Sequence, residues 1–246
     1  MKSLAIKKIV FVLFVFSSVA AYSQHTDSAD VSANQQLNAI NIYQSFVKPS
    51  TNLYAGPQYI EYAYSIPEGS PLLNADFVEG NLFYNGILYT NLPMQYDLMK
   101  ELVIVKDPMN VYKFTLFNEN VKWFTLANHK FERIINNDSG NTIMKTGFYD
   151  VLYDGKTGIY KKENLSIKET ITYNAALRRY IAETDNYYIK KDNRFYEISN
   201  KNDLLSVLKD KRKDLQQYAK KNKLKFKKYK EYAFEKIAAY YDSLNK

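Results

Sequence analysis

The sequence contains no cysteine and only two histidines in 246 residues. Without cysteine the chain can form no disulfide bond, thiol nucleophile or cysteine-ligated metal centre. His25 and His129 are too few, and too far apart in the sequence, to predict a histidine-ligated metal site. We therefore predict that the protein holds no metal and needs no cofactor.

Glycine is scarce as well, with eight residues, and none belongs to a phosphate-binding loop, a nucleophile elbow or a calcium-binding loop. Acidic residues are the remaining source of acid–base chemistry, since two carboxylates on adjacent strands could lie about 5–9 Å apart, as glycoside hydrolysis requires. The candidates are Asp76, Glu79, Asp97, Asp150 and Asp154. Structural roles at turns and strand ends explain them more simply, so we predict a protein that is not an enzyme.

Long apolar runs are missing beyond the first 23 residues, so no later segment is expected to form a membrane helix. Residues 1–23 have the three parts of a secretory signal peptide. Three lysines precede the short apolar run Ile9–Phe16, and the small residues Ala21 and Ser23 follow it. We predict cleavage before Gln24 and export to the periplasm or the outer-membrane face, with residues 24–50 as a flexible polar lead-in.

Aromatic residues are abundant, with 23 Tyr, 14 Phe and one Trp. Together with frequent turn signals they favour strands, because aromatic side chains suit a half-buried pleated surface. The strongest signal is Asn85-Gly86 between two aromatic runs, since a tight type I′ turn needs positive φ at both central residues. Further turn signals stand at residues 118–120, 137–140, 154–158 and 192–193.

These patterns predict one mainly β domain over residues 51–246. We expect an antiparallel meander, as a curved sheet or a partly open barrel, followed by a basic α-helical hairpin. The period of the apolar residues changes to 3.6 at Asn200, with Asn202 or Asp203 as the expected N-cap. The predicted helices cover about residues 203–221 and 227–244.

Each predicted helix has one apolar stripe. The first stripe comprises Leu204, Leu208, Leu215, Tyr218 and Ala219. The second comprises Phe226, Tyr229, Ala233, Ile237, Tyr240 and Leu244. The opposite faces are expected to be exposed to water.

Positive charge is concentrated on these helices. Residues 209–230 hold eleven Lys and Arg against two Asp, a balance of +9, whereas the whole chain carries +8. Clustered lysines of this kind could bind phosphate or carboxylate groups, or could form a solvated surface that keeps the protein soluble. The residues predicted to contact an anionic partner are Lys209, Lys213, Lys220, Lys221, Lys223, Lys225, Lys227 and Lys228.

Five segments resemble a group of secreted Gram-negative envelope proteins of similar length and without an established activity. They are LYAGPQY (53–59), EGSPLL (68–73), GFYDVLYDGK (147–156), YYIKK (187–191) and the C-terminal LLSVLKDKRKDLQQYAKKNKL (204–224). The likeness covers about residues 50–244. It implies an envelope location and transfers no site residues.

Three functions remain open at this point. The leading one is an exported accessory protein that binds an envelope protein, a glycan or an anionic lipid surface. The second is a β clam that carries a lipid or another ligand, and the third is the carboxylate-dependent glycoside hydrolase. Nucleic acid is not expected as a partner, because the chain is predicted to be exported and its basic residues are mostly Lys rather than Arg.

Overall fold

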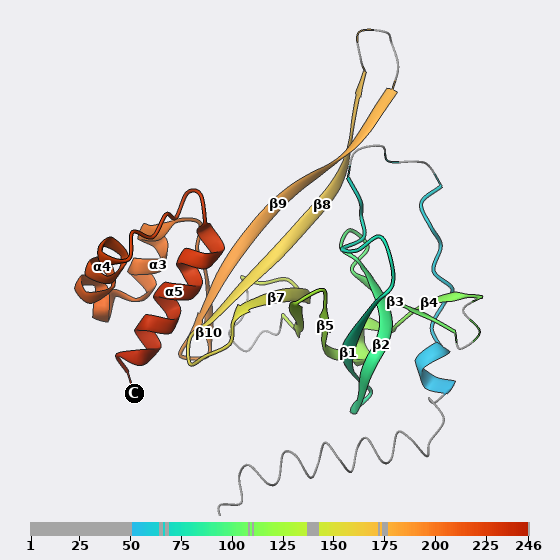
Figure 1. Cartoon of the computed structure of the whole chain (residues 1–246), viewed down its shortest axis with the longest axis horizontal. Coiled ribbons are helices and arrows are strands. Elements are labelled where there is room, and N and C mark those ends of the chain that lie inside the picture. The colour runs from blue at the N-terminus through green and yellow to red at the C-terminus, as the bar shows by residue number, and fades with distance from the viewer. Residues whose placement is uncertain are drawn as a thin grey trace, which may run out of the picture. The chain divides into compact units, whose positions relative to one another are not determined.

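The computed structural model describes residues 51–63, 66, 69–107, 109, 111–136, 143–171, 173 and 177–245. The predicted signal peptide, the lead-in over residues 24–50 and the turn expected at 137–140 lie outside these residues. Within the described part, the chain forms one antiparallel sheet of ten strands and three α-helices that follow it (Figure 1). None of the described helices has the length and apolar character needed to cross a bilayer.

The strands follow one another along the sheet in two runs. The order is β10-β9-β8-β7-β6-β5-β1-β2-β3-β4, and the sheet is open, with β10 and β4 at its edges. The first run is β1 (Val78–Tyr84), β2 (Ile87–Asp97), β3 (Leu102–Lys106) and β4 (Lys113–Thr115). The second run is β5 (Val121–Leu126), β6 (His129–Ile134), β7 (Gly147–Tyr153), β8 (Gly158–Ile171), β9 (Leu177–Lys191) and β10 (Arg194–Glu197). The predicted antiparallel meander is confirmed.

The turns predicted at residues 85–86, 154–158 and 192–193 connect neighbouring strands. Asn85 and Gly86 join β1 to β2 with φ of 51° and 78°, the positive values that a type I′ turn needs. Asp192 and Asn193 join β9 to β10 in the same way, with φ of 50° and 59°. Asn, Asp and Gly tolerate these angles, so both turns are explained by backbone geometry.

The turn signal at residues 118–120 does not mark a hairpin. The runs on either side of residues 118–120 are both strands, β4 and β5, but they do not pair with each other. A short 3₁₀ helix, η2 (Asn118–Asn120), separates them, and β5 pairs with β1 instead. This pairing joins the two runs into one sheet, so Trp123 on β5 stacks on Phe83 of β1 with ring centres 6.2 Å apart.

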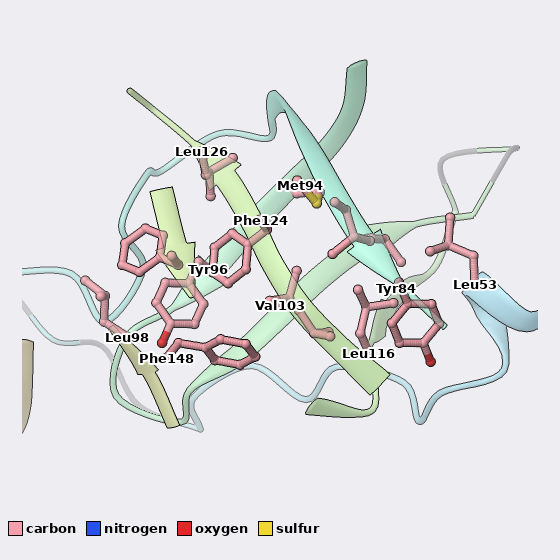
Figure 2. Packing of buried hydrophobic residues seen from close by; sticks show 14 residues of the cluster. Leu53, Tyr84, Met94, Tyr96, Leu98, Val103, Leu116, Phe124, Leu126 and Phe148 are labelled. Atoms are coloured by element: carbon pink, nitrogen blue, oxygen red, sulfur yellow. The ribbon is translucent and has the colours of Figure 1, made fainter. Parts of the chain in front are cut away.

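The first core lies on one face of strands β1 to β7. Strand alternation sends Leu82 and Tyr84 of β1 into this core, and β5 contributes Phe124 and Leu126. Figure 2 shows the rings of Tyr96, Phe124 and Phe148 close together, with Tyr96 5.0 Å from Phe124 and 6.0 Å from Phe148. Leu53, from the 3₁₀ helix η1 (Thr51–Tyr54), is also fully buried here.

A second core lies between the helices and the end of the sheet formed by β8 and β9. The helices are α3 (Lys201–Val207), α4 (Arg212–Lys221) and α5 (Lys230–Ser243), with a 3₁₀ turn, η3 (Lys209–Lys211), between α3 and α4. Ile159 of β8 and Ile189 of β9 are fully buried against them, together with Leu204, Leu215 and Ile237 of the helices. The predicted apolar stripe of the first helix is therefore buried as expected.

The second predicted stripe is partly wrong. Ala233 and Ile237 are buried as predicted, but Tyr229 is 53% exposed and Tyr241 is buried. Helix α5 starts only at Lys230, so Tyr229 precedes the helix and does not lie on its inner face. The inner face is completed by Phe234 and Ala238.

Candidate functional site

The basic segment begins at a capped helix end, two residues earlier than predicted. Asn200, not Asn202 or Asp203, is the N-cap of α3, because its Oδ1 accepts hydrogen bonds from the backbone N–H groups of Asn202 (2.8 Å) and Asp203 (3.2 Å). The Asp203 carboxylate in turn accepts from the N–H of Ser199 at 2.9 Å. The turn that starts α3 is thus held by reciprocal side-chain bonds.

The helix predicted over residues 203–221 is interrupted at Leu208. Its φ and ψ of −94° and 37° are not helical, and η3 follows before α4 begins. The interruption accompanies contacts with the sheet and α5: Asp210 accepts hydrogen bonds from Lys191 Nζ at 2.7 Å and from the Tyr241 hydroxyl at 2.9 Å. These tertiary bonds are made by residues far from Asp210 in the sequence, so helix periodicity alone could not predict the break.

All eight lysines predicted to meet an anionic partner are exposed. Lys209, Lys213 and Lys220 lie on η3 and α4, away from the buried Leu215, as the helical arc predicted. In the part of the chain that the structure describes, none of the eight ammonium groups forms an ion pair with a carboxylate. Their positive charge is therefore available to an external anion.

The structure brings three of these lysines together with two others around an open hollow of about 830 Å³. Lys225, Lys227 and Lys228 come from the segment before α5, and Lys230 is the first residue of that helix. Lys201 comes from the start of α3, and its Nζ lies 5.6 Å from the ring centre of Phe226, which also lines the hollow. We call this feature the lysine hollow.

No acidic residue lines the lysine hollow among the residues that the structure describes. Apart from the five lysines and Phe226, its lining residues are Ser199, Asn200 and Asn202. The nearby Asp203 carboxylate already accepts hydrogen bonds from Ser199 N–H and the Asn200 side chain. Sequence reasoning missed Lys201, which is separated from Lys225 by α4. Lys230 could have been found, since it continues the basic run.

Asp97 is a structural carboxylate. It is fully buried at the end of β2, where its Oδ1 accepts hydrogen bonds from the N–H groups of Met99 and Lys100 at 3.0 and 2.8 Å. The hydroxyls of Tyr59 and Tyr62 donate to its Oδ2 at 2.9 and 3.0 Å. The expectation that Asp97 ends a strand and accepts backbone hydrogen bonds is confirmed.

The other four carboxylates predicted as possible catalytic groups have different surroundings. Asp76 and Glu79 are exposed. The Asp154 carboxylate pairs with Lys130 Nζ at 2.6 Å. Asp150 is 8% exposed and lies 2.6 Å from Nδ1 of His129.

His129 and Asp150 form an imidazole–carboxylate pair, an arrangement suited to proton transfer. The hydrogen bond with Asp150 outweighs burial and raises the pKa of His129 above its ordinary value. A catalytic pair of this kind needs a third group at the other ring nitrogen. Among the described residues no hydroxyl forms a hydrogen bond with His129 Nε2. The pair therefore has the orienting half of a nucleophile-activating system, and the described residues provide no hydrogen-bonded hydroxyl to complete it.

A second cluster of charged residues lies on β8 and β9, beside the start of α5. Carboxylate oxygens of Glu163, Glu183 and Asp185 fall within 4.8 Å of one another. Lys161 Nζ lies 3.5 Å from Glu163, 3.3 Å from Asp185 and 3.1 Å from Glu231 of α5. Burial lowers the pKa of Lys161, but these carboxylates outweigh it and raise that pKa overall. The group is an ion-pair network that joins α5 to the sheet.

Comparison with models of known protein families, with curated proteins and with solved structures found no match for this chain. The interpretation of the site therefore depends on its own geometry.

Proposed function

We propose that this protein is a non-enzymatic, exported accessory protein of the cell envelope that acts by binding, and that the lysine hollow holds an anionic partner. The observation that carries the proposal is the convergence of Lys201, Lys225, Lys227, Lys228 and Lys230 on one open hollow without an acidic lining residue among the described ones. Grouping like charges is unfavourable in isolation, so an external anion would stabilise the arrangement.

The chemistry of lysine defines the class of partner. An ammonium group is a compact point charge that attracts phosphate and carboxylate groups without demanding a fixed planar geometry. Lipid headgroups and acidic glycan chains both present such groups in dense arrays. The exposed Lys209, Lys213 and Lys220 would extend the same positive surface over η3 and α4.

Export supports this choice of partners. Residues 1–23 have the pattern of a signal peptide, and the resemblance to secreted envelope proteins agrees with it. The envelope surfaces that an exported protein meets are rich in phosphate and carboxylate.

The two alternatives are weaker on the observed geometry. A carrier would need the helices to close over a ligand space, whereas they bury fully covered side chains such as Leu204, Ile159 and Ile189 against one end of the sheet. A glycoside hydrolase would need two available carboxylates. Of the five candidates, Asp97, Asp150 and Asp154 each have a structural partner, which leaves only the exposed Asp76 and Glu79.

The test is charge reversal in the lysine hollow with a matched control. The triple variant Lys225→Glu, Lys227→Glu and Lys228→Glu should lose at least about a hundredfold in affinity at low salt, because each lysine near an anionic surface contributes about 1 kcal/mol. The control reverses three exposed lysines elsewhere: Lys122, Lys145 and Lys156. It changes the net charge equally and should bind much like wild type.

Binding is measured by cosedimentation with phosphatidylglycerol vesicles and, separately, by retention on immobilised polygalacturonate. Phosphatidylcholine vesicles serve as the neutral surface. The specific affinity should fall as ionic strength rises, since exposed charges are screened beyond about 8–10 Å. A third variant that reverses Lys209, Lys213 and Lys220 should also weaken binding if the surface extends to α4. Equal binding by the hollow triple and the control triple, or binding of neither anionic surface, would refute the proposal.

A further inference from the structure

Strands β8 and β9 extend beyond the rest of the sheet as a two-stranded arm (Figure 1). On one side, β7 pairs with β8 only as far as Lys161. On the other side, β10 pairs with β9 only from Tyr188 to Lys191. The ten residue pairs from Lys162↔Asn186 to Ile171↔Leu177 therefore have no further described strand beside them, and they extend for about 30 Å. We call residues 162–171 and 177–186 the arm.

The arm is supported near its middle. An isolated two-stranded ribbon is only marginally stable in water, so contacts with other elements are needed to hold it. Leu165 packs against the first core. Ile181 touches Gly69, where an added Cβ would lie 2.9 Å from the Ile181 Cβ and where φ is +95°. Past these contacts, Glu169 and Arg179 form an ion pair at 2.7 Å across the two strands.

The end of the arm exposes large apolar side chains. Ile171 and Leu177 form the last strand pair, and they are 74% and 53% exposed. Tyr173, between them in the sequence, is fully exposed. Placing three such side chains in water at one point costs free energy that burial in an apolar medium would recover. We call Ile171, Tyr173 and Leu177 the tip.

The residues around the tip favour a lipid surface as its partner. Residues 168–179 contain Lys168, Arg178 and Arg179 against Glu169, a balance of +2. Aliphatic and tyrosine side chains bordered by positive charge match the layered order of an anionic bilayer, in which phosphate groups lie just outside the hydrocarbon. Three side chains offer only a few hundred Å², which falls short of the roughly 800 Å² per partner of a stable protein–protein interface.

We propose that the tip inserts into the outer layer of an anionic bilayer while the exposed Lys168 contacts its headgroups and the +2 balance of residues 168–179 attracts them. This inference rests on the proposed function in one respect, since it names a lipid bilayer as the anionic partner. The arm would then add an apolar anchor to electrostatic binding by the lysine hollow. Because stable attachment generally needs two such signals, the pair would resist salt better than lysines alone.

The first test reports the environment of the tip directly. Trp123 is the only tryptophan, so Trp123→Phe combined with Tyr173→Trp gives a full-length protein with one tryptophan at the tip. With phosphatidylglycerol vesicles its emission should shift to shorter wavelength, and lipids brominated on the acyl chains should quench it. The control is Trp123→Phe with Tyr112→Trp, at another exposed tyrosine, which should show neither effect.

The second test removes the apolar side chains. Ile171→Ser, Tyr173→Ser and Leu177→Ser together should lower vesicle affinity by roughly a hundredfold or more, because burying each side chain contributes to binding. The matched control removes three other exposed apolar side chains, with Ile60→Ser, Met109→Ser and Val111→Ser. This control should bind vesicles like wild type, and circular dichroism should show that both triples remain folded.

The outcomes separate this inference from the proposed function. If vesicle binding depends on the lysine hollow but the tryptophan placed at the tip shows no shift and no quenching, the tip inference is refuted and the proposed function stands. Retention on polygalacturonate without vesicle binding leads to the same conclusion. If neither anionic surface binds, both proposals are refuted.

Discussion

The replacement of Asp97 gives the sharpest test of the distinction between structural and catalytic carboxylates. Asp97 is fully buried, and four donors converge on it: the N–H groups of Met99 and Lys100 and the hydroxyls of Tyr59 and Tyr62. Asn is nearly the same size and keeps one carbonyl oxygen, which can still accept from the two N–H groups. Ala removes every acceptor.

The two substitutions should therefore differ widely in their effect on the free energy of unfolding. Each hydrogen bond to a charged acceptor contributes about 1.5–3 kcal/mol, and the tyrosine hydroxyls can turn toward other acceptors while the two N–H groups remain fixed. We expect Asp97→Ala to cost about 3–5 kcal/mol and Asp97→Asn about 1 kcal/mol. With a urea slope of about 2 kcal/mol per molar, the Ala midpoint should fall by roughly 1.5–2.5 M.

Urea unfolding monitored by circular dichroism measures both values, and vesicle cosedimentation of the folded variants measures function. Asp97→Asn should bind like wild type. A stable Asp97→Asn protein that no longer binds would place Asp97 in the functional site. Equal destabilisation by Asn and Ala would show that the negative charge matters, and the hydrogen-bond argument would then be wrong.

Three further predictions concern the turn, the histidine and export. Gly86→Val should destabilise the protein by about 1–2 kcal/mol, because a β-branched residue resists the φ of +78° although space surrounds it; an unchanged urea midpoint would contradict the turn assignment. Since Asp150 raises the pKa of His129 in the folded state, the stability that this pair contributes is fully present below about pH 6.5 and is lost as pH rises through the raised pKa. His129→Gln should therefore reduce the difference in unfolding free energy between about pH 5.5 and pH 8.5, and an unaltered pH profile would count against the pair. Intact mass spectrometry of the exported protein should show a chain that begins at Gln24, whereas recovery of a chain that retains residues 1–23 would refute export.

Sequence and structure agree best where a short segment decides its own conformation. Asn85-Gly86 and Asp192-Asn193 were identifiable as turns because positive φ restricts residue type locally. The exposed arc of lysines on α4 followed from the 100° rotation per residue of a helix. The structural role of Asp97 was also accessible, since an acidic residue at a strand end commonly accepts backbone hydrogen bonds of the following turn.

Two features of the fold, a strand pairing and a helix break, depend on contacts between residues that are distant in the chain. The pairing of β5 with β1 rather than β4 depends on long-range contacts, because a turn signal can specify a pairing only between the two strands that it joins. The break at Leu208 accompanies bonds from Lys191 and Tyr241 to Asp210, which exist only when sheet and helices are already together.

The same distinction between local sequence patterns and long-range packing applies to the two proposed sites. Local patterns were enough to establish that the C-terminal segment is basic and amphipathic and that the body is an antiparallel sheet, because charge and periodicity are properties of neighbouring residues. Folding of the whole chain was needed to bring Lys201 to the segment before α5, and the strand register was needed to show that β8 and β9 continue past their neighbours to an exposed apolar tip. The lysine hollow and the tip both depend on the relative positions of the ends of helices and strands. Those positions are set by packing across the whole domain rather than by any local pattern.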